Sequence, residues 1–473
     1  MGRRRILPKL ENVVIVDAGS DGKAVGKTED RVVFVPFAVP GDVVNVQVTK
    51  KKKSYFEGRI TEYIKYSDLR IEAECQHFGT CGGCKWQHLR YEDQLRFKQK
   101  QVEDALTRIA KIDISSMSPI LGNDKPYFYR NKLEYTFSNF KWLDDFQKGD
   151  DLSDRNMNGL GFHKPGMFDR VVDIQKCWLQ EEPSNKIRMV IRDYALKNNL
   201  EFFNLKKQEG FLRNLIIRSS TTKDLMVIVV FFKEDKENRE KLLNHIQENI
   251  PEITSLNYII NQKRNDSITD QEVVCFSGHD HIMEEMTNPQ GKVLKYKIGP
   301  KSFYQTNSIQ AQRLYTVADE FADLQGTEVV YDLYTGTGTI ANFMAAKAAK
   351  VVGIEYVEEA IEDAKINSEI NHIENTHFYA GDMVKVLTDD FVDKNGQPDV
   401  VITDPPRAGM HAKVVDMLLK LKAKKIVYVS CNAATQSRDI EILKSDYKVT
   451  KIQPVDMFPQ TAHVENVALL ELI

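Results

Sequence analysis

The pattern of apolar residues in the first sixty positions predicts a series of short β-strands. The apolar runs occupy 13–16, 31–35, 42–48 and 56–60. Turn residues separate them, among them the glycines between 19 and 22 and the Pro40-Gly41 pair. About five short strands in so few residues indicate a small closed barrel.

Mixed periodicity follows up to about residue 292. A stretch rich in Gln, Lys, Glu and Leu first predicts a helix over 91–110. Beyond it, strands are predicted at 132–137, 215–219 and 225–232, and helices at 182–198 and 238–249. Segment 141–158 is polar, rich in Asp and without periodicity, so we expect an exposed loop there. This stretch is typical of an α+β domain.

From residue 327 onward, strands and helices alternate. Strands are predicted at 329–333, 350–355, 376–379, 400–403 and 426–430, with helices at 340–349, 358–371 and 414–421. This alternation predicts a doubly wound, Rossmann-like α/β sheet that binds its ligand at the carboxyl ends of the strands. We therefore divide the chain into an OB-like barrel (1–62), a central α+β domain (63–292) and an α/β domain (293–473). Whether the helix over 91–110 packs on the third domain is left open.

Length and charge agree with this division. The chain has 473 residues and 54.3 kDa, enough for about three domains. Its 65 basic and 68 acidic residues give a net charge of −3, which excludes a uniformly basic protein that wraps nucleic acid. Residues 1–62 nevertheless carry 12 basic and 8 acidic side chains, or +4, including the run Lys50 to Lys53. On an OB-like barrel, such a run favours nucleic-acid binding over a merely solvated turn.

No segment of the sequence is apolar enough to predict a membrane span. The longest apolar run, 225–232, is too short to cross a bilayer. The basic start is followed by Pro8, Lys9 and Glu11 instead of the apolar core of a secretory signal. We therefore expect a cytoplasmic protein that does not bind membranes.

The six cysteines indicate metal binding or catalysis, because a disulfide framework is unusual in a cytoplasmic chain of this size. Three of them form the segment Cys75-x5-Cys81-x2-Cys84. This spacing matches neither common ferredoxin spacing. From spacing alone, zinc with His77 or His88 as fourth ligand is therefore a rival of an iron-sulfur cluster.

A glycine-rich loop follows the first strand of the α/β domain. Its sequence, Gly336-Thr337-Gly338-Thr339-Ile340-Ala341, fits the G-x-G-x-x-G/A pattern, and Glu355 ends the next strand, where it could bind ribose hydroxyls. Alone, the pattern fits nicotinamide cofactors as well as S-adenosylmethionine. Asp332, just before the loop, favours S-adenosylmethionine, because a carboxylate repels a pyrophosphate and attracts a sulfonium.

Two further carboxylates follow strands of this domain. The fourth strand ends in Asp404-Pro405-Pro406-Arg407, a rigid turn that can hold a carboxylate over the reactive end of the cofactor. Asp382, after the third strand, lies where an adenine amino group would be recognised. Each carboxylate alone could instead cap a helix or a turn. Their occurrence after successive strands predicts an S-adenosylmethionine site.

Cys431 ends the fifth predicted strand, at the same edge as Asp404. Most strand cysteines are inert buried thiols, but the neighbouring cofactor loop favours catalysis here. C5 of uracil is a poor nucleophile, and addition of a thiolate to C6 turns C5 into an enolate carbon that can attack a methyl group. A base must then remove the C5 proton; Glu465 is our candidate, with His463 second. Because an ordinary thiol has a pKa of about 8.5, Cys431 needs activation or proton removal on substrate binding.

Together these motifs resemble those of the bacterial iron-sulfur RNA uracil-5-methyltransferases, in particular the 23S ribosomal RNA (uracil-5-)-methyltransferases. Residues 1–62 resemble a TRAM domain, and the cysteine segment is similar to the family's cluster segment. The other matching motifs are Tyr129-Arg130-Asn131-Lys132, Gly161-Phe162-His163, Phe303-Tyr304-Gln305-Thr306-Asn307, the Asp404 turn and Ser430-Cys431-Asn432. Segment 141–158 looks longer than the family's usual turn, and Ala433 stands where the family often has proline.

The resemblance implies a monomeric enzyme that transfers a methyl group from S-adenosylmethionine to C5 of a uridine in RNA, with 23S rRNA as first choice. The residues that would contact S-adenosylmethionine are Gln305, Tyr334, Thr339, Glu355, Asp382 and Asp404. Cys431 would be the nucleophile and Glu465 the proton acceptor. The ligands of a [4Fe-4S] cluster would be Cys75, Cys81, Cys84 and Cys177. The uridine would be extruded from folded RNA, because Cys431 must approach a face of the ring.

Other functions share parts of this pattern. Uracil-5 methylation of tRNA would use the same residues. RNA cytosine-5 methyltransferases are typified by a pattern with two cysteines. The turn that begins at Asp404 in this chain contains no cysteine, so it does not match that pattern. An N6-adenine methyltransferase is expected to have an aromatic residue at the position of Arg407, and its reaction does not need a cysteine at the position of Cys431. A non-catalytic RNA-binding assembly factor would differ from all of these enzymes by not binding S-adenosylmethionine.

Overall fold

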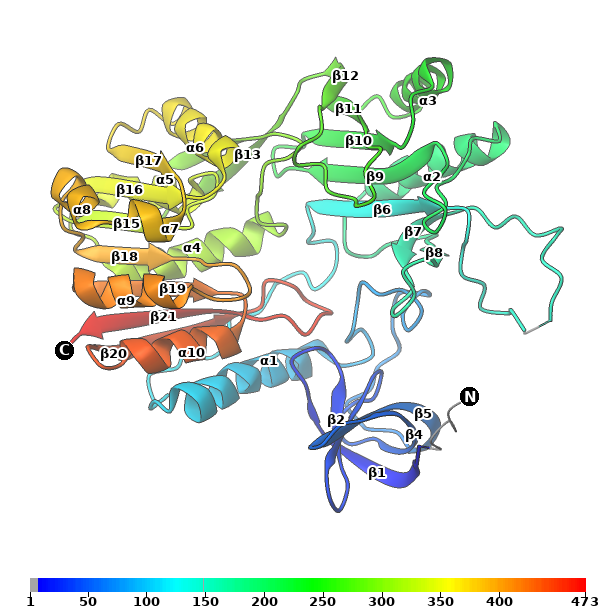
Figure 1. Cartoon of the computed structure of the whole chain (residues 1–473), viewed down its shortest axis with the longest axis horizontal. Coiled ribbons are helices and arrows are strands. Elements are labelled where there is room, and N and C mark those ends of the chain that lie inside the picture. Colours follow the sequence, from blue (N-terminus) through cyan, green and yellow to red (C-terminus); the bar gives the residue numbers. More distant parts are fainter. Residues whose placement is uncertain (1–6, 148) are drawn as a thin grey trace.

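The computed structural model describes residues 7–147 and 149–473, which form a closed barrel, two seven-stranded sheets and a two-stranded sheet (Figure 1). The barrel strands are β1 (Lys9–Ala18), β2 (Ala24–Lys27), β3 (Val32–Val35), β4 (Val43–Lys51) and β5 (Tyr55–Lys65), in the order β1-β2-β3-β5-β4. Alternate residues such as Val13, Ile15, Val44 and Val46 fill its interior. The predicted small barrel is confirmed, with the exposed run Lys50 to Lys53 on the β4–β5 hairpin.

The central sheet has the order β12-β11-β10-β9-β6-β7-β8, in which only β10 and β11 pair in parallel. Its strands are β6 (Lys132–Ser138), β7 (Gly159–His163), β8 (Val171–Asp173), β9 (Leu212–Ser219), β10 (Leu225–Phe231), β11 (Ser255–Ile260) and β12 (Val274–Gly278). Helices α2 (Ser184–Lys197) and α3 (Lys236–Asn249) cover one face through Ile187, Ile191, Leu242 and Leu243. This arrangement of strands and helices is the predicted α+β fold.

The C-terminal sheet has the order β17-β16-β15-β18-β19-β21-β20. Its strands are β15 (Val329–Leu333), β16 (Lys350–Glu355), β17 (Thr376–Ala380), β18 (Val400–Thr403), β19 (Lys425–Ser430), β20 (Tyr447–Val455) and β21 (Glu465–Leu472). The helices are α4 (Ser308–Ala322), α5 (Thr339–Met344), α6 (Glu358–Ile370), α7 (Met383–Val386), α8 (Asp389–Asn395), α9 (Ala412–Leu421) and α10 (Ala433–Leu443). Strands β15 to β19 are parallel, and β21 enters antiparallel beside β19. The predicted Rossmann-like domain is therefore confirmed.

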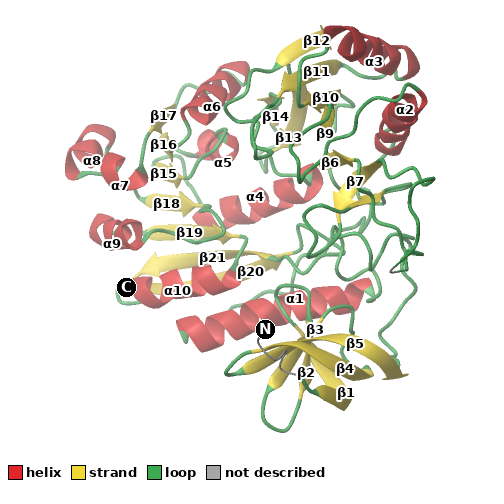
Figure 2. Ribbon diagram, turned by 45° about the vertical axis from the view of Figure 1, so that its right-hand side comes forward, coloured by secondary structure: helices red, strands yellow, loops and turns green. Residues whose placement is uncertain are grey.

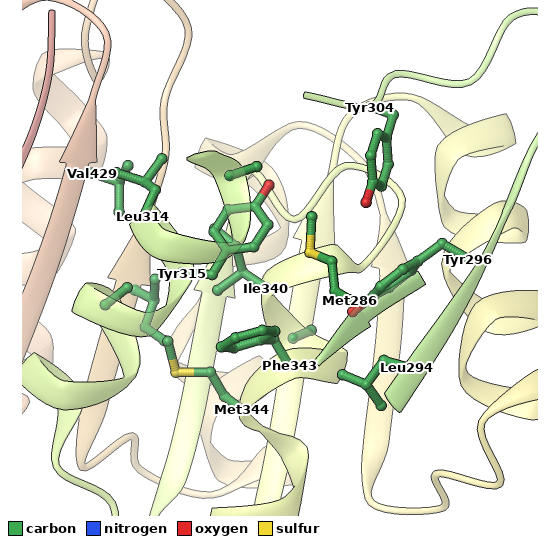
Figure 3. Packing of buried hydrophobic residues seen from close by; sticks show 14 of the residues in the cluster. Met286, Leu294, Tyr296, Tyr304, Leu314, Tyr315, Ile340, Phe343, Met344 and Val429 are labelled. Carbon is green, nitrogen blue, oxygen red and sulfur yellow. The ribbon is translucent and has the colours of Figure 1, made fainter. Parts of the chain in front are cut away.

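One hydrophobic cluster joins the two large sheets. The hairpin of β13 (Ile282–Thr287) and β14 (Val293–Ile298), together with α4, lies between them and contributes to this cluster. Met226 and Ile228 of the central sheet share the cluster with Ile340 and Val429 of the C-terminal domain. Figure 3 shows part of this packing, with Tyr296 and Tyr304 on one side and Tyr315 on the other. The two sheets are thus held together by continuous apolar packing.

Helix α1 (Tyr91–Ala105) continues as a π-helical turn, Leu106–Ala110, and lies between the barrel and the C-terminal sheet (Figure 2). Its apolar residues Val102 and Leu106 pack with Leu443 of α10 and Ile452 of β20. On the barrel side, Lys100 forms a salt bridge with Asp17. The helix over 91–110 therefore packs on the C-terminal domain.

Within the described ranges, no helix is long and apolar enough to cross a membrane.

A buried ion pair fastens α1 to the turn before β21. Lys98 Nζ lies 2.6 Å from Asp456 Oδ1, and both side chains are fully buried. The same ammonium donates to the carbonyl of Phe458, and the hydroxyl of Tyr91 donates to Asp456 Oδ2. These hydrogen bonds satisfy both charges, which a buried pair needs in order to offset its desolvation. The turn that leads to Glu465 is thereby held against α1.

We predict that Lys98→Met lowers the free energy of unfolding by about 3 kcal/mol, because it leaves the Asp456 carboxylate buried without its counter-ion. Lys100→Met on the same helix is the matched control: its ion pairs with Asp17 and Asp104 are partly exposed, so its loss should cost less than about 1 kcal/mol. Chemical denaturation monitored by circular dichroism measures both values. Equal, small effects of the two substitutions would contradict a supporting role of the buried pair.

Candidate functional site

Four neighbouring strands of the C-terminal sheet carry polar residues at one edge. Asp332 lies on β15, Asp404 follows β18, Cys431 follows β19 and Glu465 begins β21. The strand register aligns these ends, because Leu333 pairs with Thr403 and Ser430 pairs with Asn466. The parallel strands thus bring together three carboxylates and one thiol that are up to 133 positions apart in the chain.

Burial makes the carboxylates of this edge weak acids. Burial raises the pKa of Asp332 to about 7, and the negative charge of Glu355 adds to the effect. Asp332 Oδ2 accepts a hydrogen bond of 2.5 Å from Thr335, whereas its buried Oδ1 has no hydrogen-bond partner among the described residues. The surrounding protein and the charge of Asp332 also raise the pKa of Asp404 to about 7. An uncompensated buried carboxylate oxygen fits a cationic or N–H-donating ligand.

The glycine-rich loop has the backbone that its sequence predicts. Gly336 and Gly338 have φ values of 54° and 72°, and a Cβ at Gly338 would lie 2.9 Å from the Cβ of Ala364. Glu355 Oε2 accepts from the backbone N–H of Gly336, so this carboxylate holds the loop. The hydroxyl of Thr339 lies 3.3 Å from that of Thr337 at the start of α5.

Asp382 and Tyr334 lie beside this loop. Asp382 caps α7, because its Oδ1 accepts from the N–H of Val384. Asp382 thus serves as a helix cap, which is the alternative role that the sequence left open for it. Tyr334 has a φ of 64° and is half-buried, and burial raises the pKa of its hydroxyl to about 12. Both residues lie at the same sheet edge as Glu355.

Gln305 lies on a loop that the central domain holds in place. The side-chain amide of Asn131 donates to the carbonyl of Gln305 at 2.9 Å and to the hydroxyl of Ser308 at 2.8 Å. The buried guanidinium of Arg218, on β9, donates to the carbonyls of Gly299 at 2.8 Å and of Ser302 at 2.9 Å. The loop that carries Gln305 is therefore shaped by residues outside the α/β domain.

Cys431 and Glu465 face each other across the β19–β21 pair. Burial raises the pKa of the half-buried Cys431 thiol to about 11, and the charges of Glu465 and Asp404 add to this effect while Arg407 opposes it. Burial and the charge of Asp404 raise the pKa of Glu465 to about 8. In the free protein the thiol is thus protonated, and the carboxyl group of Glu465 beside it holds a proton more tightly than an ordinary glutamate does.

Arg407 and the Cys431 loop are hydrogen-bonded to each other. Asn432 Nδ2 donates to the carbonyl of Arg407 at 3.1 Å, while Asn432 Oδ1 caps α10. The buried Asp439 accepts from the N–H of Met410 at 2.9 Å and from the hydroxyl of Tyr428 at 2.7 Å. The turn after Asp404 is therefore fixed to α10, with Ala433 as the first residue of that helix.

His463 is the second candidate base, and its surroundings are cationic. Burial and the charges of Arg407, Lys98, Arg130 and Lys85 lower the pKa of His463 to about 4. A neutral imidazole with so low a pKa is a weak base. Of the two candidates, Glu465 is the stronger proton acceptor.

Four cysteines line one cavity of about 170 Å3 in the central domain. They are Cys75, Cys81, Cys84 and Cys177. Burial raises the pKa of Cys81 and of Cys84 to about 12 and also raises the pKa of Cys75 and Cys177. Of the described side chains, no group of three or more His, Cys, Asp or Glu is arranged to hold a metal ion. The cavity nevertheless brings Cys177 to the cysteine segment, as the sequence resemblance implies.

The two histidines that could complete a zinc site differ in position. His77 lines the cavity, but its Nε2 accepts from the N–H of Gln175 at 2.9 Å. His88 does not line the cavity; its Nε2 lies 3.1 Å from the carbonyl of Phe37. This geometry favours Cys177 over His88 as the fourth side chain.

The cysteine segment is fastened to the turn before Glu465. The backbone N–H groups of Lys85 and Trp86 donate to the carbonyl of Gln460 at 2.8 and 3.1 Å. The side-chain amide of Gln94 donates to Gln460 Oε1, and the N–H of Gln460 donates to Gln94 Oε1. The cysteine cavity and the Cys431–Glu465 pair therefore share a supporting turn.

Sequence reasoning alone missed Arg218, Asp439 and Tyr315. Tyr315 is buried, and the charges of Asp404, Asp332 and Glu465 help to raise its pKa. Arg218 had a weak signal, because it directly follows the apolar run 215–217 near the end of a predicted strand. Asp439 and Tyr315 had none, since each looks like an ordinary position of an amphipathic helix.

Segment 141–158 is an exposed loop in the ranges that the structure describes, as predicted. Trp142 donates to Asp144, and Arg155 forms a salt bridge with Asp145. These contacts lie within the loop and do not reach the residues of the C-terminal sheet edge.

Comparison with known proteins agrees with this geometry. The family model for tRNA (Uracil-5-)-methyltransferase matches residues 201–473, and the TRAM domain model matches residues 10–61. An RNA methyltransferase of Bacteroides thetaiotaomicron that is otherwise uncharacterized is 57% identical over 96% of this chain and 99% of its own. A similarly named protein of Porphyromonas gingivalis is 55% identical over 96% of this chain and 98% of its own.

The similarity extends to a solved structure, that of the Pyrococcus abyssi tRNA (uracil-54, C5)-methyltransferase in complex with S-adenosyl-L-homocysteine. The TM-score is 0.75 at 28% sequence identity, over 97% of this chain and 100% of the other. The match thus covers the barrel, the central domain and the α/β domain. With its strand-end carboxylates and its glycine-rich loop, the chain belongs to the tRNA (uracil-5-)-methyltransferase family and is an S-adenosylmethionine-dependent RNA (uracil-5-)-methyltransferase.

Proposed function

We propose that the protein methylates C5 of a specific uridine in RNA, with 23S rRNA as first choice, Cys431 as the nucleophile and Glu465 as the proton acceptor. The single observation that supports this assignment best is the alignment of Cys431 and Glu465 on neighbouring strands, beside the carboxylate of Asp404. A nucleophile and a base at one sheet edge are what a C5 substitution through C6 addition requires.

The proposed steps account for every bond and proton. The Cys431 thiol gives up its proton to solvent as sulfur adds to C6, and C5 becomes nucleophilic. C5 then forms its new bond to the methyl group of S-adenosylmethionine while the bond from that methyl group to sulfur breaks, and S-adenosylhomocysteine is left. Glu465 takes the proton from C5, the electron pair restores the C5–C6 double bond and expels the thiolate, and the thiolate regains a proton from solvent.

Gln305, Tyr334, Thr339, Glu355, Asp382 and Asp404 are proposed to contact S-adenosylmethionine. The buried, unpartnered Oδ1 of Asp332 and the weakly acidic Asp404 fit a cationic ligand, and the glycine-rich loop allows close approach to its backbone. Glu355 already orders the loop through Gly336, and its position after β16 still suits a ribose.

We predict that Cys431→Ala reduces methyl transfer to RNA by at least about a thousandfold, because the uracil C5 is then never activated. Cys275→Ala is the matched control: this thiol is exposed on β12, outside the proposed site, and its removal should leave the rate unchanged. Transfer of radiolabelled methyl groups to RNA measures both rates. A Cys431→Ala enzyme that works at the wild-type rate would overturn the mechanism.

The RNA partner is proposed to be 23S rRNA, with tRNA as the second candidate. The barrel and its exposed lysine run fit an RNA backbone on either substrate. The barrel together with the cysteine segment resembles the 23S rRNA enzymes and supports the first candidate, whereas the description of the matching family and the name of the Pyrococcus abyssi enzyme refer to tRNA and support the second. The family assignment supports neither cytosine-5 methylation nor a non-catalytic assembly factor.

A deletion strain distinguishes the two RNAs. Mass-spectrometric mapping should show that 5-methyluridine is lost at one or two positions of 23S rRNA, while the 5-methyluridine content of tRNA is unchanged. Re-expression of the wild-type chain, but not of Cys431→Ala, should restore it. Loss confined to tRNA would refute the rRNA assignment and establish the second candidate.

We further propose that Cys75, Cys81, Cys84 and Cys177 hold a [4Fe-4S] cluster. Four thiols that line one cavity supply the number and kind of ligands that such a cluster requires, and metal binding would remove the protons that burial otherwise retains. A cluster bound in this cavity would link segment 75–84 to Cys177. It would supply no redox step, because methyl transfer requires none.

Metal analysis of the anaerobically purified protein tests this assignment. We predict about four iron atoms and four acid-labile sulfides per chain, and a loss of most of both in Cys177→Ser. Cys275→Ser, which removes an exposed cysteine outside the cavity, should keep the full content. One zinc ion per chain, with no iron, would contradict the cluster and favour the zinc site.

A further inference from the structure

We propose that Asp404 and Glu465 share one proton in the free protein and release it when S-adenosylmethionine binds. After the methyl group has been transferred, the pair takes up the proton from C5. This inference rests on the proposed roles of Cys431 and Glu465. It gives Asp404 a second role besides contact with the cofactor. It also couples cofactor binding to the protonation state of Glu465.

The geometry of the pair supports this exchange. Asp404 and Glu465 lie at the aligned ends of β18 and β21, on either side of the end of β19 that carries Cys431. Asp332 on β15 adds a third carboxylate on the next strand. Within the described residues, none of the three carboxylates forms a salt bridge.

The neighbouring groups do not neutralise these carboxylates. Tyr315 of α4 faces all three of them as a neutral phenol, and Cys431 faces the pair as a neutral thiol. Arg407 acts on Cys431 and on His463, but it does not lower the pKa of Asp404 or of Glu465. With Asp332 and Glu465 buried, Asp404 half-buried and no compensating cation among the described residues, the free site retains at least one proton near neutral pH.

A sulfonium can take the place of that proton. S-adenosylmethionine carries one more positive charge than its product S-adenosylhomocysteine, which has a neutral thioether. A fixed positive charge near Asp404 favours the ionised form of both carboxylates, so the pair loses its proton to solvent on binding. Glu465 is then ionised before RNA chemistry begins.

The same charge disappears during the reaction. Once C5 has taken the methyl group, the pair faces a neutral thioether and again favours a bound proton. At this stage the C5–H bond breaks, Glu465 takes the proton, and Cys431 leaves as the C5–C6 double bond forms. The product therefore departs from a pair that holds one proton, as it did before binding, and the cycle closes with one proton released per methyl transferred.

Calorimetry of the complete chain tests the exchange without RNA or turnover. Binding of S-adenosylmethionine at pH 7 is measured in phosphate and in Tris, whose ionisation enthalpies differ, so the difference in heat counts the protons released. We expect about one proton for S-adenosylmethionine and close to none for S-adenosylhomocysteine. The comparison of the two ligands removes any contribution from their common amino group.

Two glutamates of the same strand provide the matched variants. Glu465→Gln should still bind S-adenosylmethionine but release at most half as many protons as the wild type. Glu471→Gln, near the far end of β21, should release as many as the wild type. Wild-type affinity gives a second measurement: for S-adenosylmethionine it should rise by up to about tenfold per pH unit while the pair titrates, and for S-adenosylhomocysteine it should stay flat.

Equal proton release by both ligands, or binding of S-adenosylmethionine without release, would overturn the exchange and leave the proposed nucleophile and base untouched. Conversely, methyl transfer at the wild-type rate by Cys431→Ala would overturn the proposed mechanism, whatever the calorimetry shows. The two failures are therefore distinguishable.

Discussion

The antiparallel pairing of β21 with β19 is the constraint on which the site depends. It places the first residue of β21, Glu465, opposite the loop that carries Cys431, and a slip by one residue would turn the carboxylate to the other face of the sheet. The turn before β21 fixes this register, because the buried Lys98–Asp456 pair and Gln460 tie it to α1 and to the cysteine segment. A helix outside the α/β domain thus helps to position Glu465, the proposed base.

Charge is distributed in the opposite sense on the barrel and at the edge of the C-terminal sheet. The barrel presents an exposed lysine run, whereas the sheet edge carries the buried Asp332 and Glu465 and the half-buried Asp404 without a cationic partner in the described ranges. The near-neutral total of −3 is the sum of these unlike regions. An RNA backbone and a cationic cofactor are therefore attracted to different surfaces of one chain.

Much of this arrangement could be predicted from the sequence, because strand and helix periods are local signals. The five parallel strands, the glycine-rich loop and the carboxylates that follow the strands all came from such signals. The packing of α1 did not, since Lys98 at helical spacing looks like a solvated position until Asp456 is seen beside it. Nor does spacing relate Cys177 to Cys84, which are 93 positions apart and meet only in the folded central domain.

Arg218 shows that the catalytic unit is not modular. The α/β domain contains every proposed catalytic residue and every residue proposed to contact S-adenosylmethionine, yet the loop with Gln305 takes its shape from Arg218 and Asn131 of the central domain. A fragment that begins at residue 293 would keep all of these residues and lose the contacts that shape the loop with Gln305, one proposed wall of the cofactor site. In evolutionary terms, the central sheet cannot be exchanged freely, because it holds a loop of the proposed active site.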